Sequence, residues 1–148
     1  ERGTILHRCF EILCTDRKLE HIIPRATGHE FGDGELEEIS SAVDQFENWL
    51  EHRFTGSILE HEVPFLSLDK NGSVIQGIVD LIVETDDDIW IVDHKSDRGD
   101  DLDEIFKFYW PQLKCYADAI SNTRSNKRMG GVIINWISHG RVSLLKFE

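Results

Sequence analysis

The sequence predicts an α/β (α+β) domain, in which a central mixed sheet is built on a β-meander and flanked by helices. Two segments near the N-terminus repeat apolar residues every three to four positions, as amphipathic helices do. Three strand-like segments then follow in direct succession, separated by short polar turns, as in an antiparallel meander. A third helical pattern and two more strand patterns complete the order α, α, β, β, β, α, β, β.

The N-terminal third of the chain contains the first two predicted helices. One covers residues 4–14, where Thr4 can cap the start, and the other covers residues 35–53 and has an acidic outer face. A loop containing proline and glycine is expected between them, at residues 24–34. The apolar stripes are Ile5, Leu6, Cys9, Ile12 and Leu13 in the first helix, and Leu36, Ile39, Val43, Phe46, Trp49 and Leu50 in the second.

The predicted meander consists of residues 58–68, 73–84 and 89–96. The turn sequence DKNG at Asp69–Gly72 joins the first two strands, and the acidic turn at Asp86–Asp88 joins the second to the third. Short turns of this kind connect antiparallel neighbours.

The C-terminal third begins with an acidic loop at residues 97–104 and continues with a helix that runs to about Ile120. Pro111 is expected in the first turn of this helix or at a break just before it, because proline lacks the amide hydrogen that a helix interior needs. The last two predicted strands are residues 131–137 and 141–147, joined by a tight turn at His139-Gly140.

Composition sets broad limits on the function. The chain has 148 residues, 40% hydrophobic and 30% charged, which is typical of one globular domain over residues 1–148. It lacks an apolar run long enough for a membrane span, and it has neither a secretory signal nor an initiator Met, so we expect a fragment of a longer cytoplasmic protein. Three cysteines without CxxC spacing predict neither a disulfide framework nor a zinc site or iron–sulfur cluster held by this chain alone.

Three charged residues occupy positions where the pattern predicts buried strands. Strand side chains alternate between faces, so Asp93 and Lys95 share one face with Ile89 and Ile91. The hairpin turn at residues 86–88 brings Asp80 of the preceding strand near Asp93. Two carboxylates and one ammonium group therefore converge at one end of the sheet.

Two neighbouring carboxylates repel each other unless a cation lies between them. Mg²⁺ and Mn²⁺ bind to one or two carboxylates together with water, and either ion suits Asp80 and Asp93. The alternative is an ordinary ion pair between Asp93 and Lys95 at a strand end. The second aspartate across the hairpin favours the metal site over that alternative.

Four short motifs are similar to one family. The segments GTILH (3–7), GIVD (77–80), DHK (93–95) and QLKCYA (112–117) occur in the order found in the RecB/AddA-type nuclease domain. That domain belongs to the PD-(D/E)xK nuclease superfamily. The resemblance implies a restriction-endonuclease-like core and a metal-dependent DNA nuclease, with exonuclease activity. It also implies that the domain lies C-terminal to a helicase motor that acts in DNA repair and recombination, together with a partner subunit.

The resemblance also implies residue roles. Asp80 and Asp93 are then metal ligands, His7 is a third ligand and the backbone carbonyl of His94 a fourth. The metal is Mg²⁺ or Mn²⁺, and Lys95 is the catalytic lysine beside it. Gln112 and Tyr116 lie one helical turn apart and help to place Lys95 and the DNA strand. Glu62, in the segment HEVPF, can supply another acid, although an exposed carboxylate at a strand end is the interpretation that we favour.

The net charge of −12 disfavours a protein that binds nucleic acid tightly by itself. It is consistent with a nuclease to which a motor delivers the strand. Two alternatives remain open: a DNA-holding module that kept the fold without the chemistry, and a stand-alone PD-(D/E)xK nuclease. The intact set of His7, Asp80, Asp93 and Lys95 favours an active enzyme over the first alternative.

Overall fold

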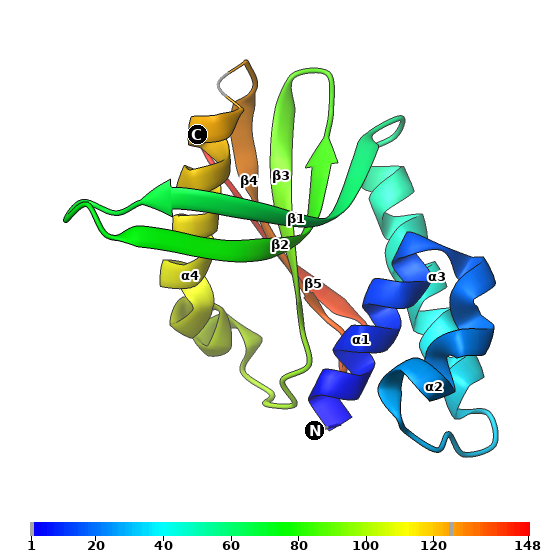
Figure 1. The fold of residues 1–148 in the computed structure, drawn as a ribbon. Coiled ribbons are helices and arrows are strands. Elements are labelled where there is room, and N and C mark those ends of the chain that lie inside the picture. Colours follow the sequence, from blue (N-terminus) through cyan, green and yellow to red (C-terminus); the bar gives the residue numbers. More distant parts are fainter. Residues whose placement is uncertain (1, 125) are drawn as a thin grey trace.

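A computed structural model describes residues 2–124 and 126–148 as five strands and the helices around them (Figure 1). The order of the elements along the chain confirms the predicted α/β fold class. The elements are α1 (Arg2–Thr15), the 3₁₀ helix η1 (Arg17–Ile22), α2 (Ile23–Thr27), α3 (Glu35–Arg53), β1 (Ile58–Leu68), β2 (Val74–Glu84), β3 (Asp88–Lys95), α4 (Leu102–Thr123), β4 (Arg128–Trp136) and β5 (Arg141–Lys146).

The five strands form one mixed sheet in the order β1-β2-β3-β4-β5. The first three pair antiparallel, which is the predicted meander. Helix α4 connects β3 to β4, and because a helix carries the chain back across the sheet, these two strands pair in parallel. The last pair, β4 and β5, is antiparallel.

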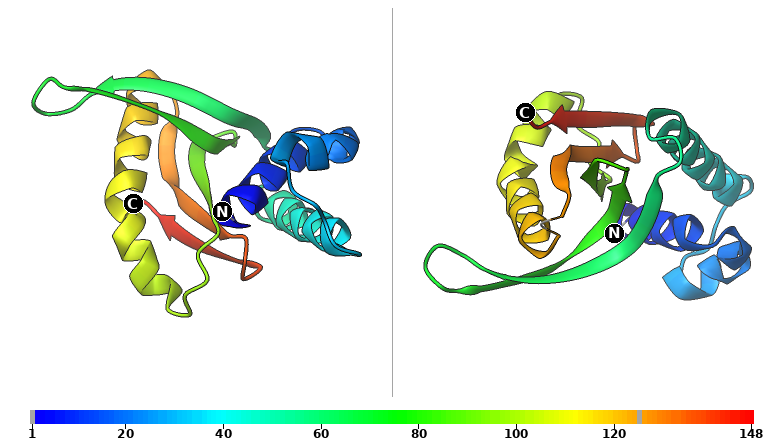
Figure 2. Two further views of the ribbon diagram at one scale, coloured as in Figure 1. Left: turned by 60° about the horizontal axis from the view of Figure 1, so that its bottom comes forward. Right: turned by 90° about the horizontal axis from the view of Figure 1, so that it is seen from above.

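Helices cover the sheet on two faces, and each face has its own apolar core (Figure 2). Strand β3 shows how the alternation of side chains divides them. Trp90 and Val92 pack on the side of α1 and α3, whereas Ile89 and Ile91 pack on the side of α4. Since both faces are covered, β3 is apolar at every position from Ile89 to Val92, and the charged residues that follow lie at the end of a fully buried strand.

The hairpin of β1 and β2 extends past the other strands and crosses α4 (Figures 1 and 2). Phe65 of β1 packs on Tyr116 of α4, with 5.1 Å between their ring centroids. Gly77 of β2 makes room for this contact, since a Cβ atom there would lie 2.9 Å from the ring of Phe65. The hairpin thereby packs against the helix that carries Gln112 and Tyr116.

Helix α4 differs from its prediction. It begins at Leu102, inside the segment expected to be an acidic loop, because the Asp101 side chain accepts a hydrogen bond from the amide of Glu104 and caps the helix. Pro111 lies in the middle of the helix, so the expected position in a first turn or at a break was wrong. Its ring projects toward solvent, and burial of the apolar face on either side of it outweighs the lost backbone hydrogen bond.

Two smaller differences concern the N-terminal region and the start of β4. Residues 23–27, expected to be loop in part, form the short helix α2, with Pro24 in its first turn and Gly28 in a left-handed conformation after its end. Strand β4 begins at Arg128, before the predicted start at residue 131.

Among residues 2–124 and 126–148, every helix is too short or too polar to span a lipid bilayer.

Candidate active site

The centre of the candidate site is a pair of buried carboxylates on adjacent strands. The register of β2 and β3 places Leu81 opposite Val92, one residue from Asp80 and Asp93 respectively. Asp80 is 8% exposed and Asp93 is 6% exposed. The backbone amide of His94 donates a hydrogen bond of 2.8 Å to Oδ2 of Asp80, which fixes this carboxylate against β3.

Helix α1 adds an imidazole to the pair. Nε2 of His7 lies 3.2 Å from Oδ2 of Asp80. This hydrogen bond raises the pKa of His7 above its usual value, against the opposing effect of burial. Gly3, one turn earlier, allows the approach of α1, because a Cβ atom there would collide with the hydroxyl group of Ser96 just after β3.

The two carboxylates have opposite pKa shifts. Burial by itself would raise the pKa of Asp80, but hydrogen bonds from His7, from Asp93 and from the His94 amide outweigh it and hold the pKa below its usual range. Burial and the adjacent Asp80 raise the pKa of Asp93, although Lys95 opposes this. The pair therefore favours a shared proton or another positive charge at this position.

Lys95 joins the strand side of the site to helix α4. Its Nζ lies 2.9 Å from Oδ2 of Asp93 and 3.2 Å from Oε1 of Gln112. Gln112 in turn donates a hydrogen bond of 3.1 Å from Nε2 to the hydroxyl oxygen of Tyr116. The structure thus brings together side chains that the sequence singled out on α1, β2, β3 and α4, namely His7, Asp80, Asp93, Lys95, Gln112 and Tyr116.

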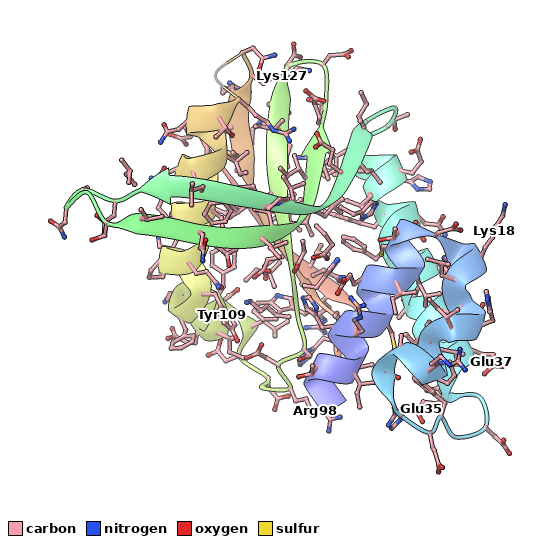
Figure 3. All side chains as sticks on the ribbon, in the orientation of Figure 1. Lys18, Glu35, Glu37, Arg98, Tyr109 and Lys127 are labelled. Atoms are coloured by element: carbon pink, nitrogen blue, oxygen red, sulfur yellow. The ribbon has the colours of Figure 1, made fainter. Side chains whose placement is uncertain are left out.

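Tyr109 belongs to the same cluster and was missed in the sequence. The Lys95 ammonium lies 4.3 Å from the centre of its ring, and its hydroxyl group donates to both oxygens of Asp97, at 3.0 and 3.1 Å. Burial and the hydrogen bond to Asp97 raise the pKa of Tyr109 to about 12. Tyr109 lies three residues before Gln112, and this spacing on a helix could have placed it on the same face in the sequence analysis. Figure 3 labels Tyr109 on α4 and Arg98 in the loop that precedes this helix.

Glu62 also lies at the site, contrary to the favoured interpretation of an exposed carboxylate at a strand end. It occupies the middle of β1, between His61 and Val63, whose partners on β2 are the residues on either side of Asp80. Its backbone has a φ of 51°, the single positive value among the described residues other than glycine. Burial, and then the charges of Glu11 and Asp80, raise the pKa of Glu62 to about 7.

The ring of His94 points to the opposite face from Lys95 and is buried behind the carboxylates. Phe10 and Phe46 pack on it with centroid distances of 5.5 and 5.4 Å. Nδ1 of His94 lies 3.1 Å from Nδ2 of Asn135 on the parallel strand β4, and burial lowers the pKa of His94 to about 4. The imidazole is therefore neutral, and its Nδ1 accepts from Asn135. Asn135 was missed, although it is the one polar residue in the run VIINWI.

A groove of about 370 Å³ borders the site between α1 and the end of β3. His7 and Arg8 of α1 line it on one side, and His94 and Lys95 of β3 line it on the other. Acidic side chains, Glu11 and Asp97, line it as well. A ligand in this groove would contact His7, which binds Asp80, and Lys95, which pairs with Asp93.

The carboxylates fit a hard divalent ion by their chemistry. The Lys95 ammonium is close enough to Oδ2 of Asp93 for an ion pair. Within the described part of the chain, however, this buried oxygen accepts no hydrogen bond of good geometry. Over the same residues, no three His, Cys, Asp or Glu side chains form a preformed metal cluster. Mg²⁺ is usually held by one or two carboxylates, water and substrate phosphates, so Asp80 and Asp93, with His7 beside them, suit it without such a cluster.

One protein family and two known proteins are similar to this chain in sequence or in structure. The profile of the PD-(D/E)XK nuclease superfamily matches residues 1–145. The chain is 32% identical over 72 residues to an ATP-dependent helicase/nuclease subunit from Ligilactobacillus salivarius (strain UCC118), a match that covers 49% of this chain and 6% of that protein. Among solved structures, the crystal structure of SSO0001 matches 97% of this chain and 64% of its own chain, at 20% identity and a TM-score of 0.44.

Proposed function

The chain belongs to the PD-(D/E)XK nuclease superfamily and is a nuclease, and from that premise we propose that it hydrolyses phosphodiester bonds of DNA with Mg²⁺ or Mn²⁺. One observation carries the proposal. The buried carboxylates of Asp80 and Asp93 lie side by side on β2 and β3, and the ammonium group of Lys95 lies 2.9 Å from Asp93. Two buried carboxylates side by side cost stability unless a proton or a cation lies between them.

The proposed protein ligands of the metal are the carboxylates of Asp80 and Asp93, the ring of His7 and the backbone carbonyl of His94. A bound divalent ion lowers the pKa of its water and polarises the phosphoryl oxygen. The protein's own contribution is to fix the ligands. The His94 amide fixes the carboxylate of Asp80 by a hydrogen bond. The contact between the His94 ring and Asn135 in turn fixes the β3 backbone that carries this amide.

Lys95 is the proposed catalytic cation. Asp93, Gln112 and the ring of Tyr109 contact its ammonium group from different directions, so its position is restricted before the substrate arrives. A cation held in this way supports the stabilisation of negative charge that builds on the phosphate during hydrolysis. We therefore favour charge stabilisation over orientation of the attacking water as the role of Lys95.

Gln112 and Tyr116 are the proposed residues that place the DNA strand. Their hydrogen bond leaves both side chains on the face of α4 that also contacts Lys95. A strand that passes along this face meets the lysine and the carboxylates together. The groove beside α1 is lined by Lys95 and Tyr109 as well, and so adjoins this face.

We further propose that the domain is an exonuclease that works with a helicase motor in double-strand-break repair and recombination. The name of the Ligilactobacillus relative, a helicase/nuclease subunit, supports this, and the matched segment covers only 6% of that protein. The net charge of −12 supports delivery of the strand by another domain or by a partner subunit. The three free thiols are consistent with the cytoplasm, where such chemistry takes place.

The direct test is DNA degradation by the domain with and without metal. We expect cutting with Mg²⁺ or Mn²⁺, none in excess chelator, and none by Asp80→Asn. Asp118→Asn is the matched control, because it makes the same chemical change at an exposed carboxylate that pairs with Lys114 on α4. Full activity in chelator or in Asp80→Asn would reject the proposed chemistry. A folded wild type that binds DNA without cutting it would favour the DNA-holding alternative.

A further inference from the structure

We propose that Phe108 stacks on a nucleobase of the substrate strand next to the cleaved bond and thereby positions that strand. This inference rests on the proposed DNA nuclease function and assigns a residue to the recognition of the bases. Phe108 is 78% exposed, more than Leu68 at 66% or Val74 at 64% on the β1–β2 hairpin. An aromatic ring of that exposure loses little by leaving water and gains contact area when a planar ligand covers it.

The position of Phe108 on α4 points to the substrate path. Phe108, Gln112 and Tyr116 follow one another at intervals of four residues, so they form one row along the helix. Gln112 in this row contacts Lys95, and its Nε2 contacts Tyr116. One helical turn, about 6 Å along the axis, separates Phe108 from the residue that holds the catalytic lysine.

The contacts of Phe108 link it to the site through a second residue. Its ring packs edge-on against Tyr109, with 5.3 Å between the centroids. The ring of Tyr109 in turn carries the Lys95 ammonium at 4.3 Å. Phe108 therefore extends the wall that Tyr109 and Gln112 form beside Lys95, and its outer face is open to a ligand.

The charges around this wall favour a base over a phosphate as the ligand of Phe108. The first turn of α4 carries Asp103 and Glu104, and Glu104 already binds the neighbouring Lys107 at 2.9 Å. Phosphates meet few unpaired cations here, whereas stacking on an aromatic ring needs no positive charge. A strand can thus be held near the site in spite of the chain's net charge of −12.

Stacking predicts a defined kinetic change. Removal of an aromatic stacking partner weakens single-strand binding by roughly 5- to 150-fold per base. For Phe108→Ala we expect KM for an oligonucleotide to rise within that range, while kcat at saturating DNA stays close to the wild-type value. Phe108→Trp should keep the wild-type KM, and Phe108→Leu, which keeps an apolar side chain without an aromatic face, should behave like Phe108→Ala.

Ile58→Ala is the matched control, because Ile58 is 62% exposed and pairs with Glu84 at the end of the β1–β2 ladder that lies away from the hairpin turn. This variant should leave KM unchanged. An equal rise of KM in Ile58→Ala and Phe108→Ala would show a general effect of lost surface and would overturn the proposal. The exposure of both side chains means that the variants are expected to fold.

The decisive experiment combines the variant with an abasic substrate. An abasic residue is moved through the positions around the cleaved bond, and KM is measured for wild type and Phe108→Ala. At one position the abasic residue should weaken the wild type as much as Phe108→Ala does, and it should add nothing further in the variant. Additive effects of the two changes at every position would overturn the proposal.

Binding without cutting separates this inference from the proposed function. With Ca²⁺ in place of Mg²⁺, an oligonucleotide carrying the fluorescent base 2-aminopurine at the identified position should be quenched by wild type and Phe108→Trp, and not by Phe108→Ala. A wild type that cuts DNA but quenches no better than Phe108→Ala would refute the stacking and leave the nuclease function intact. A wild type that quenches but does not cut in any metal would refute the nuclease chemistry and retain the stacking.

Discussion

The two sides of the candidate site are built differently. On the strand side, Asp80 and Asp93 are buried and held by the backbone register of β2 and β3. On the helix side, Gln112 is exposed, and the hydrogen bonds that position it come from side chains. A backbone ladder fixes a side chain more tightly than a surface hydrogen bond between flexible side chains does, because the ladder's many bonds form and break together.

Reacting groups and recognition surfaces require different degrees of rigidity. Reacting groups must be held within a fraction of an ångström, which a buried strand end can achieve. A surface that recognises DNA must follow the shape of the bound strand, and exposed side chains on a helix can adapt to it. We therefore expect variants on the strand side to stop catalysis and variants on the helix side to reduce it by smaller factors.

The largest effect is expected from Asp93→Asn, on the strand side. The change keeps the shape of the side chain and removes one of two buried charges, so cutting and Mn²⁺ binding should both disappear. Without metal the variant should be more stable than wild type, because the raised pKa of Asp93 means that its ionised form destabilises the folded protein above the pKa of the unfolded chain. An increase of about 1 kcal/mol in the free energy of unfolding would raise Tm by roughly 2–4 °C for a chain of this size.

Activity assays, calorimetric titration with Mn²⁺ and thermal melts in chelator at pH 8 and pH 4 test this prediction. The stabilisation should be present at pH 8 and should shrink toward pH 4, where Asp93 is protonated in both the folded wild type and, in part, the unfolded chain. A variant that is active, or one that melts well below wild type at pH 8, would contradict the assignment of Asp93 as a destabilised ligand.

Lys95→Ala should have the next largest effect, since Lys95 bridges the two sides of the site. Loss of a preorganised charge that stabilises the transition state typically lowers kcat by about 10²–10³-fold. Mn²⁺ affinity should remain the same or increase, because a cation 2.9 Å from Asp93 no longer competes with the ion. Calorimetry on Lys95→Ala distinguishes the roles: if Mn²⁺ binding is lost, Lys95 supports the ligands and is not the catalytic group.

The smallest effect is expected on the helix side, from Gln112→Ala. The substitution removes a hydrogen bond to a charged group, and the exposure of Gln112 places the loss near the lower end of the usual range, about tenfold in kcat/KM. Lys114→Ala, two residues further along α4 and paired with Asp118, should have no comparable effect. A loss in Gln112→Ala as large as in Lys95→Ala would remove the distinction between the two sides.

The strand side was predictable from the sequence because strand alternation has a fixed period of two and the turn at residues 86–88 is short. These two facts place Asp80 beside Asp93 without any knowledge of packing. The helix side was less predictable. The start of α4 depends on the cap by Asp101, and Pro111 is tolerated because of apolar burial around it, and neither effect is visible in periodicity.

The residues that were missed share a physical reason. Asn135 contacts His94 across a parallel pair of strands, and the partner and register of a parallel strand depend on how the crossover helix packs. Glu62 reaches the site through a left-handed backbone that no propensity predicts for glutamate. Tyr109 shares a helix face with Gln112, but that face could be chosen only after Lys95 had been placed opposite it.

The backbone of Glu62 has a consequence for how this domain can change under selection. A residue with a Cβ atom in the left-handed region costs about 1–2 kcal/mol relative to its ordinary conformation, and glycine avoids that cost. Mutation to glycine is thus an accessible gain in thermal stability, obtained by giving up a carboxylate beside Asp80. A glycine there would relax the backbone of β1, but it would remove one of the negative charges that raise the pKa of His7. Backbone stability and the electrostatics of the site are thus opposed at this residue.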